Sequence, residues 1–344
     1  MSLGRGTAAN PPNRFDPLHV ERDLDQPDGG HTLYYRDRSG SILVENDSPD
    51  VGCRWGINPY RGCEHGCVYC FARPTHQYLG FSAGLDFERR IMVKNDAPAL
   101  LRAALHHPRW QPAPVMFSGN TDCYQPVERT LEITRRCLQV FAEFRNPVSM
   151  ITKSALVARD ADVLHELERY DAAHVMSSIT TLDPDLARRL EPRAAIPTKR
   201  LEAIGTLTAA GVPVGVMIGP VIPGLNDAEI PRILEAAAAA GARSAAWVLL
   251  RLPTPVDELF VSWLETHFPD RKERVLGRIR ECRGGELSDS RFGVRQRGEG
   301  PYAQQLRQLF DVTARRHGLD RPQPALSTAA FRRPTRAGDQ LRLL

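Results

Sequence analysis

From residue 114 onward, short apolar runs alternate with longer segments of helical periodicity. In the longer segments apolar residues recur every three or four positions, the spacing of an amphipathic helix, whereas the short runs are typical of buried strands. This pattern predicts strands at 115–117, 148–151, 174–179, 214–218 and 245–252, and helices at 127–144, 159–170, 184–190, 199–210, 227–240 and 256–267.

Repeated alternation of strand and helix predicts a parallel sheet with right-handed crossovers. One more strand, expected just before residue 58, brings the number of units to about six. The predicted fold class is therefore α/β, a partial (β/α)6 TIM-like barrel.

The barrel is expected to span residues 51–268, with extensions at both ends. Residues 1–50 are rich in Gly, Pro, Asp and Arg and predict an N-terminal arm with strand-like segments at 31–35 and 41–44. Residues 269–320 predict a C-terminal helical extension, with helices at 270–282 and 302–317. The Pro- and Arg-rich residues 321–344 predict a basic, mobile tail.

Composition places the chain among soluble globular proteins. Hydrophobic residues make up 42% and charged residues 25% of the 344 residues. No apolar run approaches the length needed to span a bilayer, and the first residues lack a signal-peptide core. We therefore expect a cytoplasmic, monomeric protein that does not enter a membrane.

Arginine dominates the positive charge. Only four of the 45 basic residues are lysines, and the net charge is +4. Arginine suits phosphate recognition. An Ala- and Arg-rich chain also follows from genome composition, so a modest charge does not establish binding to nucleic acid.

Three of the seven cysteines, Cys63, Cys67 and Cys70, lie in one short stretch. Thiolates are ligands for iron–sulfur clusters and zinc, and three of them can hold three corners of a four-iron cluster while the fourth iron stays open. Gly62 and Gly66 allow the tight bends that bring the sulfurs together. The alternatives are a zinc site completed by His65, and three cysteines packed in the core.

The pattern Cys63-x3-Cys67-x-Tyr69-Cys70 resembles the signature of radical S-adenosylmethionine (SAM) enzymes. The resemblance implies a [4Fe-4S] cluster whose open iron is chelated by SAM, and a partial barrel. It also implies cleavage of SAM to methionine and a 5′-deoxyadenosyl radical that abstracts hydrogen, with an electron donor such as flavodoxin or ferredoxin. Further matches resemble the spore photoproduct lyase (DNA repair photolyase-like) group.

Polar residues follow the predicted strands, where barrel enzymes build their sites. The loop Ser118, Gly119, Asn120, Thr121 and Asp122 matches the place where this superfamily binds the SAM amino group, although a polar surface turn has the same composition.

The same resemblance implies roles for four further residues. Lys153 resembles the lysine that contacts the SAM carboxylate, and Ser178 the serine near its polar groups. Tyr69 and Ile218 are expected beside adenine, with core packing as the alternative.

Cys123 is a candidate hydrogen donor. The lyases carry a donor cysteine on this loop, but it aligns near Gly119, so Cys123 is displaced and is otherwise a buried thiol. Cys53, Cys137 and Cys282 are interpreted as structural. Residues 288–302 are expected to cap the barrel mouth and contact substrate or phosphate, or else to form a solvated basic loop.

The sequence therefore predicts a radical SAM enzyme of unidentified substrate. A nucleic-acid lesion or base follows by analogy with the lyases. The alternatives are a peptide or small metabolite, and a zinc- or cluster-stabilised nucleic-acid-binding module without catalysis.

Overall fold

The computed structural model describes residues 6–7, 9–11 and 31–335. Its strands are β1 (Leu33–Arg36), β2 (Leu43–Glu45), β3 (Trp55–Ile57), β4 (Tyr60–Arg61), β5 (Arg90–Val93), β6 (Val115–Phe117), β7 (Val148–Thr152), β8 (Ala173–Ser178), β9 (Val214–Val221) and β10 (Ser244–Leu249).

The α-helices are α1 (Leu85–Arg89), α2 (Ala97–His106), α3 (Glu128–Leu131), α4 (Ile133–Phe144), α5 (Ala161–Glu168), α6 (Pro184–Leu190), α7 (Pro197–Ala209), α8 (Ile230–Ala239), α9 (Val256–His267), α10 (Lys272–Glu281), α11 (Val294–Arg297) and α12 (Gly300–Arg316). Four 3-10 helices join them, η1 (Arg73–Leu79), η2 (Ala155–Asp160), η3 (Asp227–Glu229) and η4 (Pro269–Arg271).

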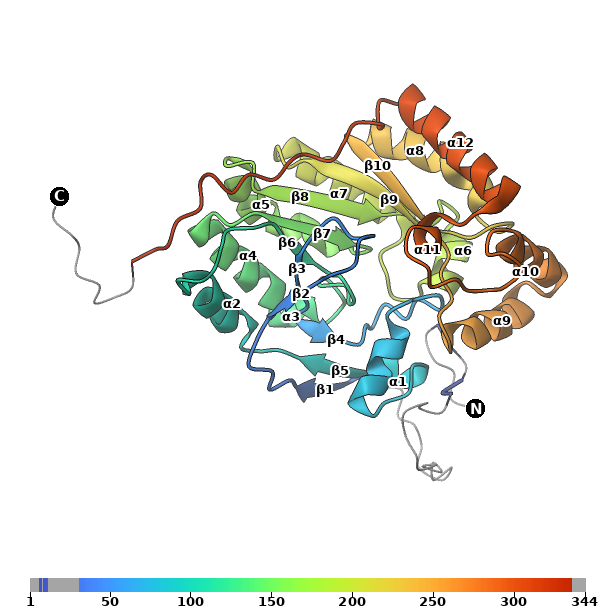
Figure 1. Cartoon of the computed structure of the whole chain (residues 1–344), viewed down its shortest axis with the longest axis horizontal. Coiled ribbons are helices and arrows are strands. Elements are labelled where there is room, and N and C mark those ends of the chain that lie inside the picture. The colour runs from blue at the N-terminus through green and yellow to red at the C-terminus, as the bar shows by residue number, and fades with distance from the viewer. Residues whose placement is uncertain (1–5, 8, 12–30, 336–344) are drawn as a thin grey trace.

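Seven strands form the main sheet, in the order β10-β9-β8-β7-β6-β3-β2 (Figure 1). Six of these strands pair in parallel, namely β3, β6, β7, β8, β9 and β10, and β2 adds one antiparallel strand at the edge. Six parallel strands with helices between them confirm the predicted partial (β/α)6 barrel. The largest hydrophobic cluster joins the sheet to α2, α4, α5, α7 and α8.

The strand predictions are confirmed to within a few residues, and the main differences concern helices. The predicted helix at 127–144 is broken at Glu132, whose φ of 51° is left-handed, so α3 and α4 are separate. Residues 283–301, between the two helices predicted for the C-terminal extension, contain the short helix α11.

Residues 31–50 are built into two sheets. Strand β1 pairs in parallel with β5 in a small sheet, and β2 pairs with β3 at the edge of the main sheet. Upstream, the Gly6 backbone N–H donates to the buried Glu88 carboxylate at 3.2 Å. Residues 1–5, 8 and 12–30 of the predicted arm lie outside the described residues.

Residues 319–333 cross the amino ends of the barrel strands. The Leu319 carbonyl accepts from Ala245 at the start of β10, the Ser327 N–H donates to Asp171 before β8, and the Arg332 N–H donates to Phe144 before β7. Figure 1 shows this red segment running along the sheet away from α12. These backbone bonds hold the segment to the barrel, and the mobility predicted for residues 321–344 stays a prediction. Residues 336–344 lie outside the described part.

The expected helical extension packs directly on the barrel. A second hydrophobic cluster joins α9 and α10 to Cys67, Val68 and Leu250. The boundary at 268 stays a prediction. No helix within the described ranges has both the length and the apolar character needed to cross a bilayer.

Candidate active site

The three clustered cysteines lie on the loop between β4 and η1. Cys63 and Cys67 are buried, Cys70 is half-buried, and all three are free thiols. Gly62 has a φ of +80°, and a side chain there would meet His76 and the Phe87 carbonyl at about 3 Å. The glycine predicted to bend the loop is therefore required by its backbone and by its neighbours.

A buried ion pair supports this loop. The Arg73 guanidinium donates to the Cys67 carbonyl at 2.9 Å and to the Glu88 carboxylate at 2.6 Å, and both side chains are fully buried. Removing one partner of a buried pair leaves an uncompensated charge, so this pair holds the loop in one conformation.

The three thiols are buried or half-buried neighbours that do not converge on a single point. Burial raises the pKa of all three thiols, and the charges of Cys67 and Cys70 raise the pKa of Cys63 further. Within the described residues, no three Cys, His, Asp or Glu side chains converge as ligands of one ion do. In a four-iron cluster each thiolate binds its own iron, so convergence on one point is not required.

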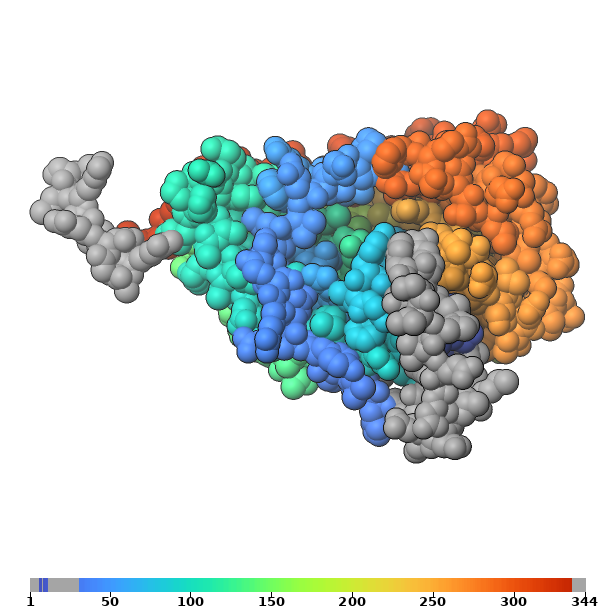
Figure 2. Space-filling model, turned by 60° about the horizontal axis from the view of Figure 1, so that its bottom comes forward, coloured from blue at the N-terminus to red at the C-terminus, as the bar shows by residue number. Residues whose placement is uncertain are grey.

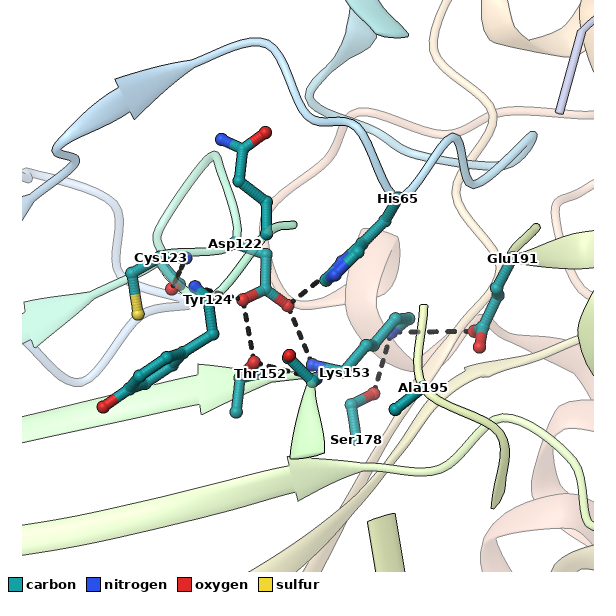
Figure 3. A network of polar contacts seen from close by, with 12 residues as sticks. His65, Asp122, Cys123, Tyr124, Thr152, Lys153, Ser178, Glu191 and Ala195 are labelled. Carbon is teal, nitrogen blue, oxygen red and sulfur yellow. Dashed lines mark hydrogen bonds and ion pairs between the residues drawn. The ribbon is translucent and has the colours of Figure 1, made fainter. Parts of the chain in front are cut away.

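Asp122 is the centre of a polar network at the carboxyl ends of β6 and β7 (Figure 3). Its carboxylate accepts from the Thr152 hydroxyl at 2.7 Å, from the Lys153 N–H at 2.8 Å and from the Tyr124 N–H at 2.9 Å. His65 of the cysteine loop lies 3.4 Å away. Asp122 therefore ties the loop after β6 to β7 and to the cysteine loop.

The first part of this loop is strained and pinned. Ser118 has a φ of 70°, which is uncommon for a residue other than glycine, and its hydroxyl accepts from the Cys123 N–H at 2.9 Å. The Asn58 side chain accepts from the N–H groups of Asn120 and Thr121 at 3.1 and 3.3 Å. Gly119 lies within the pinned segment, and Asn120 is exposed.

Lys153 and Ser178 are brought together, as their positions at strand ends predict. The Lys153 ammonium donates to the Ser178 hydroxyl and to the Gly219 carbonyl, both at 2.8 Å. Its side chain is 17% exposed and lies 4.0 Å from the Glu191 carboxylate. The carboxyl ends of β7, β8 and β9 therefore share one partly buried cation.

Glu191 is the functional candidate to which the sequence gave no role. Its fully buried carboxylate accepts from Tyr69, Thr180 and Arg200. Although burial raises its pKa, Arg200 and Lys153 hold that pKa at about 2, so the group is ionised. A charged residue in a Glu-Pro sequence, just after a helix and near a strand end, was the only signal available.

Tyr69 and Ile218 differ from their predicted surroundings. The Tyr69 hydroxyl enters the Glu191 network and also lies 3.3 Å from Thr180, so contact with adenine stays a prediction. Ile218 lies in the hydrophobic core and is 1% exposed. Ser178 pairs in register with Met217, so Met217 shares the Ser178 face and Ile218 points the other way. This placement favours the alternative of core packing for Ile218, and its contact with adenine stays a prediction.

Cys123 is completely buried in the hydrophobic core. In Figure 3 its sulfur points away from His65, Asp122 and Lys153. Burial raises its pKa well above the ordinary value. A hydrogen-donor role stays a prediction, and this placement favours the alternative of a structural thiol.

Comparisons with known proteins identify the superfamily. Residues 57–237, more than half of the chain, match the sequence profile of the radical SAM superfamily. An uncharacterized protein of Mycobacterium tuberculosis (strain ATCC 25618 / H37Rv) is 36% identical over 230 residues, which are 66% of each chain. The matched region thus spans just under two thirds of that relative.

Two more similarities concern proteins with descriptive names. A radical SAM Nalpha-GlyT isomerase of Pseudomonas phage M6 is 25% identical over 186 residues, covering 53% of this chain and 36% of that protein. A solved structure of a spore photoproduct lyase variant aligns over 83% of this chain and 78% of its own, with a TM-score of 0.55 and 16% identity. The latter likeness concerns the fold, and the profile match settles the family: the chain belongs to the radical SAM superfamily.

Proposed function

We propose that this radical SAM enzyme holds a [4Fe-4S] cluster on Cys63, Cys67 and Cys70 and abstracts hydrogen from a base in nucleic acid. Membership of the superfamily implies the cluster and SAM. When bound, this pair supplies the 5′-deoxyadenosyl radical, while the protein provides binding, orientation and shielding.

One observation carries the proposal: the cysteine loop and the Lys153 ammonium meet the same carboxyl edge of the barrel. His65, which lies between Cys63 and Cys67, is 3.4 Å from Asp122, and Asp122 accepts from the Lys153 N–H. Carboxyl edges of parallel barrels are where active sites lie.

The side chains of this edge have separate tasks in the proposal. The Lys153 ammonium binds the SAM carboxylate, with Ser178 and the Gly219 carbonyl holding the lysine in place. Residues 118–121 receive the SAM amino group through backbone and side-chain oxygens. Asp122 orients that loop, because its acceptors are already engaged by Thr152, Tyr124 and Lys153. Met217, on the Ser178 face, replaces Ile218 beside adenine.

Glu191 holds two other side chains of the site in place, Tyr69 and Lys153. Its ionised carboxylate holds the Tyr69 hydroxyl and lies 4.0 Å from the Lys153 ammonium. This fixes an aromatic ring directly before Cys70 and places a negative charge beside the lysine. A reduced flavodoxin or ferredoxin supplies the electron, and the enzyme acts as a cytoplasmic monomer.

The substrate class rests on two similarities and on chemistry. The chain shares its fold with a spore photoproduct lyase and 25% of matched residues with a GlyT isomerase. A base inside a duplex cannot reach a buried radical, so the substrate is single-stranded or has a flipped-out base. Binding is expected to weaken steeply as salt rises.

The SAM site is tested by removing the Lys153 charge. In anaerobically reconstituted protein, Lys153→Met is expected to weaken SAM binding about tenfold or more, because a charge-assisted contact contributes about 1.5–3 kcal/mol. Lys199→Met, on an exposed α7 lysine, is the matched control. Equal SAM affinity in both variants and the parent would contradict the assignment.

The substrate is tested by isotope transfer. Oligonucleotides deuterated on the base are incubated with reduced enzyme and SAM, and 5′-deoxyadenosine is examined for deuterium. Deuterium in the product identifies nucleic acid as the hydrogen source. Transfer from a deuterated peptide or metabolite, with none from any nucleic acid, would replace the substrate class and leave the cofactor chemistry standing.

A further inference from the structure

The partial barrel has an opening between its two edge regions, and side chains bridge it. The loop between β2 and β3 carries Asp50, and the short helix α11, which follows α10, carries Arg295. Arg295 pairs with the Asp50 carboxylate, which also accepts from the Gly293 N–H at 2.7 Å. Residues far apart in the sequence therefore form a clasp across the open side.

The segment after α10 is also anchored on the end of β10. The buried Arg283 guanidinium donates to the Leu250 carbonyl at 2.6 Å and to the Arg295 carbonyl at 3.0 Å. This places residues 283–297 beside the carboxyl end of the last barrel strand. The predicted position of this loop near the barrel mouth is consistent with these contacts.

Arg251 lies between the clasp and the cysteine loop. It follows the carboxyl end of β10, and its guanidinium lies 5.1 Å from the centroid of the Phe71 ring. Phe71 directly follows Cys70 and is 46% exposed. The charge and the ring thus stand side by side, next to the proposed cluster and open to solvent.

Among the described residues, the Arg251 guanidinium has neither a hydrogen bond nor an ion pair. The Asp50 carboxylate acts on the Arg251 guanidinium electrostatically, but its hydrogen bonds go to Arg295 and to the Gly293 N–H. Burial lowers the pKa of Arg251, and Arg295 lowers it further, although a guanidinium stays protonated in proteins. A half-buried cation without an anion is expected to attract one from outside.

We propose that Arg251 binds a backbone phosphate of a single-stranded nucleic-acid substrate, while the exposed Phe71 ring stacks on an adjacent base. The inference rests on the proposed function and adds to it a binding subsite beside the cluster. Arginine and aromatic side chains together are the usual means of holding a single strand, because the charge follows the backbone and the ring accepts any base.

The surface offers an entry for such a strand. Figure 2 shows a hollow bounded by the blue and cyan N-terminal segments and by the orange C-terminal segments, with green and yellow segments at its floor. Arg295 lies close enough to Arg251 to act on it electrostatically, so this side carries more than one guanidinium. A peptide with acidic side chains lacks the flat base that the exposed Phe71 ring would hold.

The test measures affinity for a labelled single-stranded oligonucleotide over a range of salt concentrations, without reducing the enzyme. Arg251→Gln is expected to weaken binding about tenfold and to lower the slope of log affinity against log salt by about 1. Arg251→Lys should restore much of the slope and less of the affinity. Phe71→Leu should weaken binding while leaving the slope unchanged.

A matched control lies at the other end of the barrel. Arg145 also stands over an aromatic ring, that of Tyr170, at 4.2 Å, but it precedes β7 at the amino end. Arg145→Gln removes the same charge and should leave affinity and slope unchanged.

Three results would overturn the inference. The first is the same affinity and slope for Arg251→Gln and the parent. The second is an equal loss in Arg145→Gln, which would reflect net charge alone. The third is a parent enzyme that forms 5′-deoxyadenosine but binds no oligonucleotide, which would leave the cofactor proposal intact; an acidic peptide bound through Arg251 would then name the partner.

Discussion

The two ends of the barrel are closed in different ways. At the carboxyl end, Asp122, Lys153, Glu191 and Arg200 are charged groups with little or no exposure. At the amino end, residues 319–333 cross the strands through backbone hydrogen bonds and the contact of Phe331 with Phe144.

This difference indicates that the carboxyl end holds a functional site, whereas the amino end is only covered by the chain. Burying charge costs free energy that pairing only partly returns, whereas backbone bonds and aromatic packing need no such compensation. Charges concentrated at one end therefore point to chemistry there. The following changes should affect the two ends differently.

The largest effect is expected at the cysteine loop. Cys67→Ala removes one of three proposed ligands, so anaerobically reconstituted protein should lose its iron and sulfide and form no 5′-deoxyadenosine above background. Cys53→Ser is the control, because Cys53 lies in a different loop and bonds the Trp55 and Pro114 carbonyls. A Cys67→Ala protein with full iron content would refute the ligand assignment.

Glu191→Gln should be the most destabilising change in the polar network. It leaves the buried Arg200 charge unpaired, which costs about 3–5 kcal/mol of unfolding free energy. Denaturant unfolding of this variant is compared with that of Glu202→Gln, an exposed α7 residue that pairs with Lys199. Equal stability of the two variants would contradict a stabilising pair between Glu191 and the buried Arg200 guanidinium.

The Glu191 carboxylate should also make the stability of the protein depend on pH. Its pKa is about 2 in the folded protein, below the ordinary value of 4.5. Its stabilising contribution is therefore complete above pH 4.5 and is lost as pH falls through about 2. The parent should lose more stability across this interval than Glu191→Gln does.

His174, near the start of β8, should give a smaller effect at higher pH. Burial lowers its pKa to about 4, below the ordinary 6.5. The unfolded chain takes up this proton first, so stability falls as pH drops from 6.5 toward 4, by about 1.4 kcal/mol per pH unit at most. His174→Phe should reduce this loss of stability. Part of the loss should remain, because the pKa of His76 is also about 4. An unchanged slope would contradict the burial of a neutral imidazole.

The smallest effect is expected at the amino end. Phe331→Ala removes the contact with Phe144, at a centroid distance of 6.3 Å, and should lower stability by about 1 kcal/mol. SAM affinity should not change, because the contact lies at the opposite end from Lys153. A loss of SAM affinity with unchanged stability would contradict the claim that the amino end contributes to stability and not to SAM binding.

Local patterns were sufficient to predict the barrel and part of the site. Each parallel strand is a short apolar run, and Lys153 and Ser178 lie at or just beyond the carboxyl ends of two of them. Parallel pairing then brings these ends together, so the Lys153–Ser178 contact follows from topology.

The remaining features depend on tertiary contacts. Tyr69, Thr180, Glu191 and Arg200 meet only after the cysteine loop folds onto the barrel. Along β9, where nearly every residue is buried, the alternation of faces leaves no polar signal, so the sequence could not show which way Ile218 points. The segment at 319–333 resembles a tail in composition, and its backbone bonds with the barrel have no sequence signature.

The most direct test of the central claim is the product formed when anaerobically reconstituted protein is reduced in the presence of SAM. The account predicts 5′-deoxyadenosine and methionine in equal amounts, and neither product from Cys67→Ala. Protein that holds a full four-iron cluster and binds SAM, yet yields no 5′-deoxyadenosine on reduction, would contradict it.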